Sequence, residues 1–185
     1  MFRPLAYRTL RLAVLPLVAL AAAVLIAYAQ PGDLSTLLPG NNGVAGWAML
    51  NADTAAGKPD ELYKIYNGDD GRWKTAGVTR AYQRYYKNGK SNKVCRVIIN
   101  QTGTAWQKAK ALYAAEKDKI DGLNTYRTYQ AGKEACLATA NGSTTGHCWS
   151  KYYYLSVQIN GTTDAETGAC KQFLTAVANK VNQSG

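Results

Sequence analysis

Apolar residues recur at three- and four-residue spacing in three stretches of the chain, which is the pattern of an amphipathic helix. These stretches span residues 59–68, 104–122 and 163–181. The longest run lies in the third stretch, where five apolar positions share one face: Cys170, Phe173, Leu174, Val177 and Val181. The pattern predicts three helices, each with one buried face.

The predicted helices carry recognisable end signals. Thr104 and Gln107 can form a capping box, in which each side chain bonds the backbone amide of the other, and so can Thr163 and Glu166. Asn67-Gly68 ends the first helix in the manner of a C-cap. We therefore expect the second and third helices to begin at these two threonines.

Between the helices, stretches rich in Val, Ile, Thr and Tyr predict strands. A short strand covers residues 47–50, a hairpin joins residues 78–87 and 93–99 through the loop NGKSN, and a second hairpin joins residues 134–140 and 147–159 through NGSTTG. The element order is β-α-β-β-α-β-β-α. This order predicts an α+β fold, with a mainly antiparallel sheet and about three helices packed against it.

The N-terminus has the composition of a secretory signal peptide. Three arginines precede an apolar run over residues 12–28, and small residues at positions 27 and 29 suit cleavage after Ala29. The alternative is a retained anchor, although 17 apolar residues interrupted by Pro16 fall short of the roughly 20 that span a bilayer. We expect a periplasmic or secreted protein.

The rest of the chain divides simply. After the signal peptide at residues 1–29, residues 30–44 form an irregular entry segment rich in Gly, Pro and Asn, and residues 45–185 form a single α+β domain. An exported domain of this length can bury about two-thirds of its unfolded surface.

All four cysteines lie in the predicted mature chain, and an even number in an exported protein favours disulfides over thiols. A hairpin pairing centred on the first glycine of NGSTTG would set Cys136 opposite Cys148. Cys95 in a central strand would then pair with Cys170 on the last helix. A structural zinc site is not expected, because no Cys-x-x-Cys pair is present and His147 is the only histidine.

Positive charge is concentrated in one part of the chain. The mature chain has 19 Lys and Arg against 12 Asp and Glu, a net charge of +7. Residues 72–119 hold 12 of the basic residues and two acidic ones, a net of +10. Such a field attracts anionic partners such as a polysaccharide, lipid head groups or nucleic acid.

Within this basic stretch, strand alternation sharpens the expectation. Arg80, Tyr82, Arg84 and Tyr86 share one face of the first hairpin strand, and a five-residue NGKSN loop would set Arg84 opposite Arg96. Arginine with tyrosine is suited to gripping phosphates, sulfates or sugar rings. These five residues are the candidate ligand-binding face.

Two alternatives remain open at this face. A two-residue turn at Asn88-Gly89 would change the register and set Arg84 opposite Lys93. A basic, tyrosine-rich sheet face is also often no more than solvated surface.

For an enzyme, the chain offers little. His147 stands between Gly146 and Cys148 at the start of a predicted strand, and it is the one candidate for acid–base chemistry. No motif for a cofactor, a metal or an activated nucleophile accompanies it. A small extracytoplasmic hydrolase using His147 with a carboxylate is therefore the alternative function.

Several short motifs together resemble a known family. Leu38-Pro39, Gly46-Trp47 and LYKIYNG (residues 62–68) are followed by YYKNGK, GTAWQKAKALY and KYYYLSVQI. This order is similar to that of an exported bacterial family classed only as a domain of unknown function, although Tyr66 stands where that family has Ile. A weaker likeness exists to exosortase-associated proteins of exopolysaccharide production. The resemblance implies export and the same fold, and it implies no catalytic residue.

Taken together, the sequence favours an exported, disulfide-stabilised, non-enzymatic envelope protein that requires no cofactor. We expect its basic, tyrosine-rich sheet face to bind an anionic polymer or a partner protein.

Overall fold

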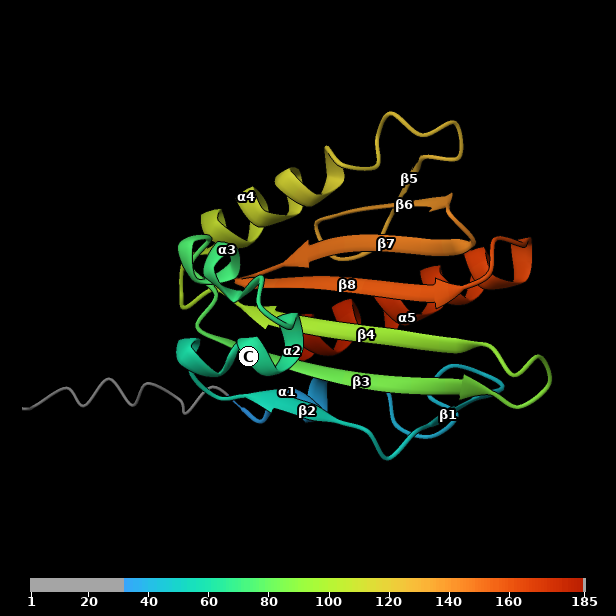
Figure 1. The fold of residues 1–185 in the computed structure, drawn as a ribbon, viewed down its shortest axis with the longest axis horizontal. Coiled ribbons are helices and arrows are strands. Elements are labelled where there is room, and N and C mark those ends of the chain that lie inside the picture. The colour runs from blue at the N-terminus through green and yellow to red at the C-terminus, as the bar shows by residue number, and fades with distance from the viewer. Residues whose placement is uncertain (1–31, 185) are drawn as a thin grey trace, which may run out of the picture. The chain divides into compact units, whose positions relative to one another are not determined.

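A central antiparallel sheet of eight strands organises the chain in the computed structural model, which describes residues 32–184 (Figure 1). The predicted signal peptide and its cleavage site lie outside the described residues. The strand order is β1-β3-β4-β8-β7-β6-β5, with β2 also paired to β3. The strands are β1 (Trp47–Met49), β2 (Thr54–Ala56), β3 (Arg80–Asn88), β4 (Val94–Gln101), β5 (Arg127–Tyr129), β6 (Glu134–Ala140), β7 (Ser143–Ser150) and β8 (Tyr153–Asn160).

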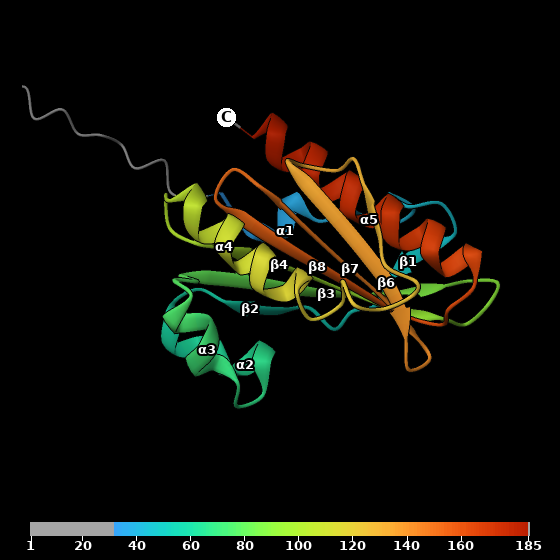
Figure 2. The same ribbon diagram turned by 90° about the horizontal axis from the view of Figure 1, so that it is seen from above.

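Helices cover both faces of the sheet (Figure 2). They are α1 (Leu34–Leu37), the 3₁₀ turn η1 (Pro59–Glu61), α2 (Tyr63–Tyr66), α3 (Asp70–Thr75), α4 (Trp106–Lys117) and α5 (Asp164–Gln183). α1 and α5 pack on one face, and α2, α3 and α4 pack on the other. The predicted α+β class and its mainly antiparallel sheet are confirmed. Within residues 32–184, no helix has both the length and the apolar character that crossing a bilayer requires.

Strand alternation divides the buried side chains into two cores. Cys95, Val97 and Ile99 of β4 point to the α5 side and join the first core, whereas Ile98 points to the α2–α4 side and joins the second. Arg96 is two residues from Ile98 and therefore points to the same side of the sheet, the α2–α4 side, which we call the second side. This second side carries the candidate site.

The helix end signals were correct in two places out of three. Thr163 and Glu166 form the predicted capping box at the start of α5. Asn67 ends α2 in the left-handed conformation, with φ of 47°. The predicted capping box at Thr104 is wrong: α4 begins at Trp106 after Ala105, without a side-chain cap.

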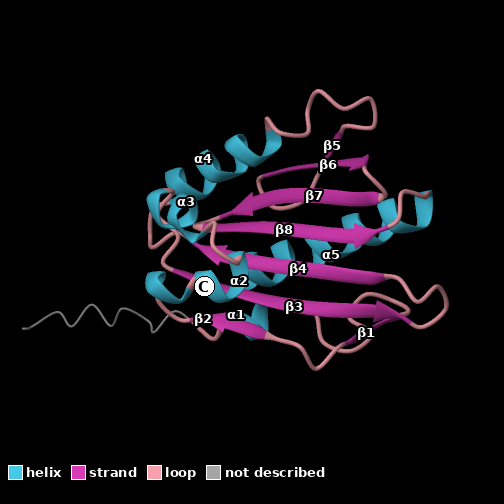
Figure 3. Cartoon of the chain, in the orientation of Figure 1, coloured by secondary structure: helices cyan, strands magenta, loops and turns pink. Residues whose placement is uncertain are grey.

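Residues 32–44 of the predicted entry segment are more ordered than expected. Asp33 caps the short helix α1, and Leu34, Leu37, Leu38 and Val44 are buried in the first core. The sequence pattern also missed α3 and β2 and gave no bounds for β5; all three are short elements. Strands β2 and β5 lie at the edges of the sheet, and α3 is one of the helices that pack on its second side (Figure 3).

The second predicted hairpin is a three-stranded meander. Asn141-Gly142 forms the turn between β6 and β7, with φ of 49° and 73°, so most of the predicted loop belongs to β7. The predicted single strand over residues 147–159 is interrupted at Lys151, where φ is 51°. Strands β7 and β8 then pair along their whole length.

This register corrects the predicted disulfides. Cys136 pairs with His147, and Cys148 pairs with Ala135, so Cys136 and Cys148 point to opposite faces of the sheet. The predicted Cys136–Cys148 bridge is wrong, because side chains on opposite faces cannot bond without breaking the sheet. Cys95 and Cys170 do share the first core, and the structure holds all four cysteines as free, buried thiols.

Candidate functional site

The predicted binding face is divided between the two sides of the sheet. In the β3–β4 hairpin, Arg84 pairs with Val97 and Tyr85 pairs with Arg96. The predicted opposition of Arg84 to Arg96 is wrong by one residue, and the alternative opposition to Lys93 is wrong as well. Arg96 therefore lies on the opposite side of the sheet from Arg80, Tyr82, Arg84 and Tyr86.

Arg84 and its two neighbouring tyrosines have structural partners. Arg84 is 9 % exposed, and its guanidinium donates to both carboxylate oxygens of Asp53 at 2.7 to 3.1 Å. Burial alone would lower the pKa of Arg84, but the hydrogen bonds and the negative charge of Asp53 raise it overall. Tyr82 donates to Asp53 at 2.7 Å, and the fully buried Tyr86 donates to the Pro39 carbonyl at 2.8 Å. These side chains fasten the entry segment and the loop before β2 to the sheet.

Arg96 has a different environment on the second side. Its Nε donates to Oε1 of Gln83 at 2.6 Å, and its Nη2 donates to the carbonyl of Ile65 at 2.8 Å. Both acceptors are uncharged. Among the described residues, no carboxylate lies within ion-pair distance of Arg96. The guanidinium is thus held in one position while its charge stays uncompensated.

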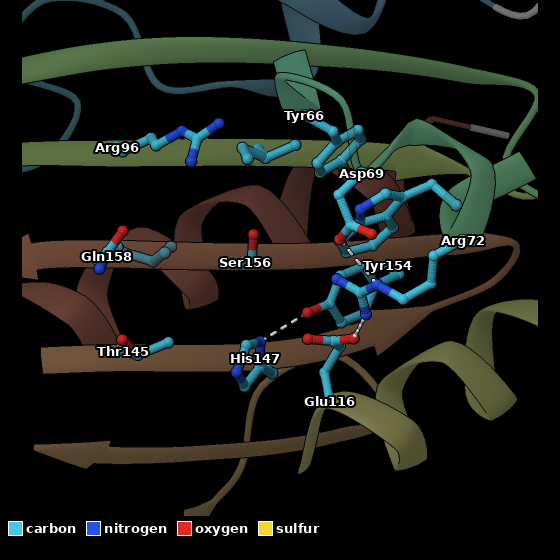
Figure 4. Close-up of a pocket in the computed structure, with 13 residues that line it drawn as sticks. Tyr66, Asp69, Arg72, Arg96, Glu116, Thr145, His147, Tyr154, Ser156 and Gln158 are labelled. Carbon is cyan, nitrogen blue, oxygen red and sulfur yellow. Dashed lines mark hydrogen bonds and ion pairs between the residues drawn. The ribbon is translucent and has the colours of Figure 1, made fainter. Parts of the chain in front are cut away.

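A cleft of 270 Å³ lies beside Arg96, with strands β4, β8 and β7 as its floor and α2, α3 and α4 at its walls (Figure 4). We call it the Arg96 cleft. Its polar lining residues are Tyr66, Asp69, Arg72, Arg96, Glu116, Thr145, His147, Tyr154, Ser156 and Gln158. A second hollow of 380 Å³ shares Arg96 and Tyr66 with the cleft and adds Lys64 and Tyr85. Arg96 is therefore accessible from two adjoining spaces.

Charges are balanced where α3 and α4 line the cleft. Arg72 of α3 bonds Glu116 of α4, and its Nε lies 3.0 Å from Oδ2 of Asp69. Lys119 approaches Glu116 to 2.8 Å. The Arg72 guanidinium also lies over the Trp73 ring, 4.5 Å from its centroid. These contacts tie α3 to α4 and leave Arg96 as the positive charge without a counter-charge in this part of the described chain.

His147 lies in the floor of the cleft, in the middle of β7, and is 6 % exposed. Its Nδ1 is 2.6 Å from the hydroxyl of Tyr154, and burial lowers the pKa of His147 to about 4. The imidazole is therefore neutral at pH 7. Burial raises the pKa of Tyr154, so this phenol keeps its proton, and the tautomer of the histidine decides which of the two groups donates. The neutral ring carries a proton on one nitrogen and a lone pair on the other.

The sequence reasoning missed several cleft residues, and their signals differ. Tyr154, Ser156 and Gln158 alternate along β8 with Leu155, Val157 and Ile159, and this alternation could have placed them on one face. Arg72 and Glu116 had no such signal, because their pairing joins α3 to α4 across 44 positions of sequence. No group of three or more His, Cys, Asp or Glu side chains that could hold a metal ion occurs within residues 32–184.

Comparison with known proteins adds no further information. The chain matches no family model, no curated protein and no solved structure. The resemblance to an exported family of unknown function, described above, stays a proposal.

Proposed function

We propose that this is an exported, non-enzymatic envelope protein that binds an anionic polymer, with Arg96 meeting a negative group of the ligand in the Arg96 cleft. One observation carries the proposal: Arg96 is positioned by two uncharged acceptors and has no acidic partner among the described residues. The predicted export signal at residues 1–29 and the excess of basic residues support the proposed location and ligand class.

The energetic argument concerns the cost of partial burial. A guanidinium that is partly removed from water loses hydration, and neutral acceptors replace only part of it. A carboxylate, sulfate or phosphate in the cleft would complete the hydrogen bonding with charge-assisted bonds, which are stronger than neutral ones. Arg84 and Arg72 have already made this compensation internally, through Asp53 and Glu116.

The cleft also offers neutral hydrogen-bonding groups suited to a polar ligand. Thr145, Ser156 and Gln158 line it from neighbouring strands, and Figure 4 shows them on the same side of the sheet as Arg96. His147 adds a neutral imidazole. Hydroxyl and amide groups of this kind orient a ligand, whereas the arginine supplies the attraction.

The hydrolase alternative has one supporting observation, since Glu116 and His147 line the same cleft. A general base needs a pKa near the working pH, and burial lowers the pKa of His147 to about 4. Glu116 is engaged by Arg72 and Lys119. For these reasons we favour binding over catalysis.

The test is a salt elution from immobilised heparin, used as a generic sulfated polyanion. We expect the Arg96→Gln variant to elute at clearly lower salt than the parent protein, because a bound charge has been lost. Arg127→Gln is the matched control: it removes the same charge from the exposed edge strand β5. Equal elution of the two variants would contradict the proposal, since it would mean that only net charge matters.

A further inference from the structure

A second candidate site is built around an exposed tryptophan. Trp106 is 48 % exposed, and Tyr63 is the one other large hydrophobic side chain classed as exposed in the described part of the chain. Trp106 stacks on Trp149, with ring centroids 5.9 Å apart and an angle of 17° between the ring planes. Trp149 belongs to the second core and is 7 % exposed. The buried indole therefore fixes the exposed one in a defined orientation.

Two lysines complete a hollow at this platform. Trp106, Trp149, Lys133 and Lys151 line a space of 370 Å³. Lys151 donates to the carbonyl of Asn182 at 3.2 Å, which holds its ammonium group close to the surface. Lys133 has no carboxylate within ion-pair distance among residues 32–184. An aromatic face is thus bordered by positive charge.

The hollow continues along α4. A second space of 410 Å³ shares Lys133 and is lined by Tyr113 and Lys117 of α4 and by Thr128, Gln130 and Glu134 of the β5–β6 edge. We call the two spaces together the Trp106 groove. None of its lining residues lines the Arg96 cleft. The groove is consequently a separate site, and its length suits an extended ligand.

We propose that the Trp106 groove binds an acidic oligosaccharide composed of uronic acid units. One pyranose ring stacks on Trp106, because its C–H bonds carry partial positive charge and the indole face is negative. The carboxylate of that unit pairs with Lys133. The next unit lies against Thr128, Gln130 and Glu134, whose hydroxyl, amide and carboxylate groups bond sugar hydroxyls.

The composition of the groove favours this ligand over other occupants. Lysine is depleted in the cores of protein interfaces, which disfavours a protein partner at a site with three lysines. Single-stranded nucleic acid also stacks on tryptophan, and the comparison with a thymidine 12-mer below distinguishes it from the oligosaccharide. A carbohydrate with one carboxylate per ring satisfies both the aromatic face and the mixed charges.

The experiment compares two hexasaccharides by isothermal calorimetry with the purified protein. One is β-1,4-linked mannuronate and the other is β-1,4-linked mannose, so they differ in the carboxylate alone. We expect binding of the mannuronate and at least about tenfold weaker binding of the neutral sugar, the equivalent of about 1.4 kcal/mol. Trp106→Ala should weaken mannuronate binding by about tenfold or more, a typical loss for a stacked ring, and Lys133→Gln should weaken it severalfold.

Two further variants keep the result specific. Tyr63→Ala removes the other exposed aromatic side chain, and Lys90→Gln removes an exposed positive charge from the loop between β3 and β4; both should bind the mannuronate as the parent does. Circular dichroism of each variant checks that it is folded. Unchanged affinity in a folded Trp106→Ala variant would overturn the proposal, and so would tighter binding of a thymidine 12-mer than of the mannuronate. If Arg96→Gln abolished mannuronate binding and Trp106→Ala did not, the ligand would bind in the Arg96 cleft, and the Trp106 groove would be refuted as its site.

Discussion

The hydroxyl oxygen of Tyr154 lies 2.6 Å from Nδ1 of His147, and both side chains are buried between the sheet and α2–α4. This bond links adjacent strands β8 and β7 on the floor of the Arg96 cleft. It also makes the neutral form of the histidine part of the folded state. Protonating the ring would place a charge in a site where the nearest carboxylate, that of Glu116, is already paired.

The first prediction concerns the pH dependence of stability. Burial lowers the pKa of His147 to about 4 from the ordinary value of 6.5. Between these values the unfolded chain binds a proton that the folded chain does not, so the free energy of unfolding should fall as pH falls. We expect the contribution to be complete above pH 6.5 and a loss of about 2 to 3 kcal/mol by pH 4.5, measured by urea denaturation.

His147→Asn is the control for this prediction. The asparagine carbonyl can accept the Tyr154 hydroxyl but does not titrate. The variant should therefore show a clearly smaller loss of stability between pH 6.5 and 4.5 than the parent. Identical pH slopes would show that His147 is not the titrating group.

A second prediction concerns the contact between β7 and α5. A Cβ atom added at Gly146 would lie 2.7 Å from Sγ of Cys170 and 2.8 Å from Cδ1 of Leu174. Gly146→Ala should therefore destabilise the protein by about 1 to 3 kcal/mol through overpacking. The double variant Gly146→Ala/Cys170→Ala should recover part of this loss of stability, because it lacks the Sγ atom that lies nearest to the new Cβ.

Gly168 gives the matched control for the second prediction. It lies inside α5, and a Cβ there meets no atom within 4 Å. The same Gly→Ala change should stabilise the helix by about 0.5 to 1 kcal/mol. Thermal and urea unfolding measure both effects, and a loss of stability at Gly168 as large as that at Gly146 would rule out the steric explanation.

The third prediction concerns Arg84, which the sequence reasoning placed in the binding face. Arg84→Gln removes the partner of Asp53 and leaves a partly buried carboxylate unpaired. We expect a loss of about 2 kcal/mol, less than for a fully buried pair because the Asp53 side chain is partly exposed. Arg127→Gln on the exposed edge should change stability by less than about 0.5 kcal/mol. Equal stability of the two variants would contradict this prediction, because it would mean that Arg84 contributes no more to folding than an exposed arginine.

The error in the predicted β3–β4 register has a local physical cause. Asn88 accepts hydrogen bonds from the amides of Lys90 and Ser91 at 2.9 Å, and its own amide bonds the carbonyl of Lys93. Asn88 therefore still pairs with the partner strand, and the loop has four residues rather than five. A shift of one residue reverses the face of every side chain in a strand.

By contrast, features encoded by neighbouring residues were predictable. The α5 capping box and its buried stripe depend on residues three or four apart, and both are present. The Asn141-Gly142 turn is also a local signal: the two-residue hairpin rule applied there gives the observed register and separates Cys136 from Cys148. The pairing of Arg72 with Glu116 depends on tertiary packing of α3 against α4, which no local pattern encodes.

One feature of the sheet bears on how the protein behaves at high concentration. β1 pairs with residues 86–88 of β3, β2 pairs with residues 81–83, and the amide of Leu50 bonds the carbonyl of Tyr85 between them. Two short strands thus occupy the outer edge of β3 almost completely, and the opposite edge of the described sheet is the three-residue β5. Long unpaired edges are the templates on which chains add to one another as fibrils. Because β1 and β2 together cover the outer edge of β3, they protect this tyrosine-rich chain from edge-to-edge aggregation.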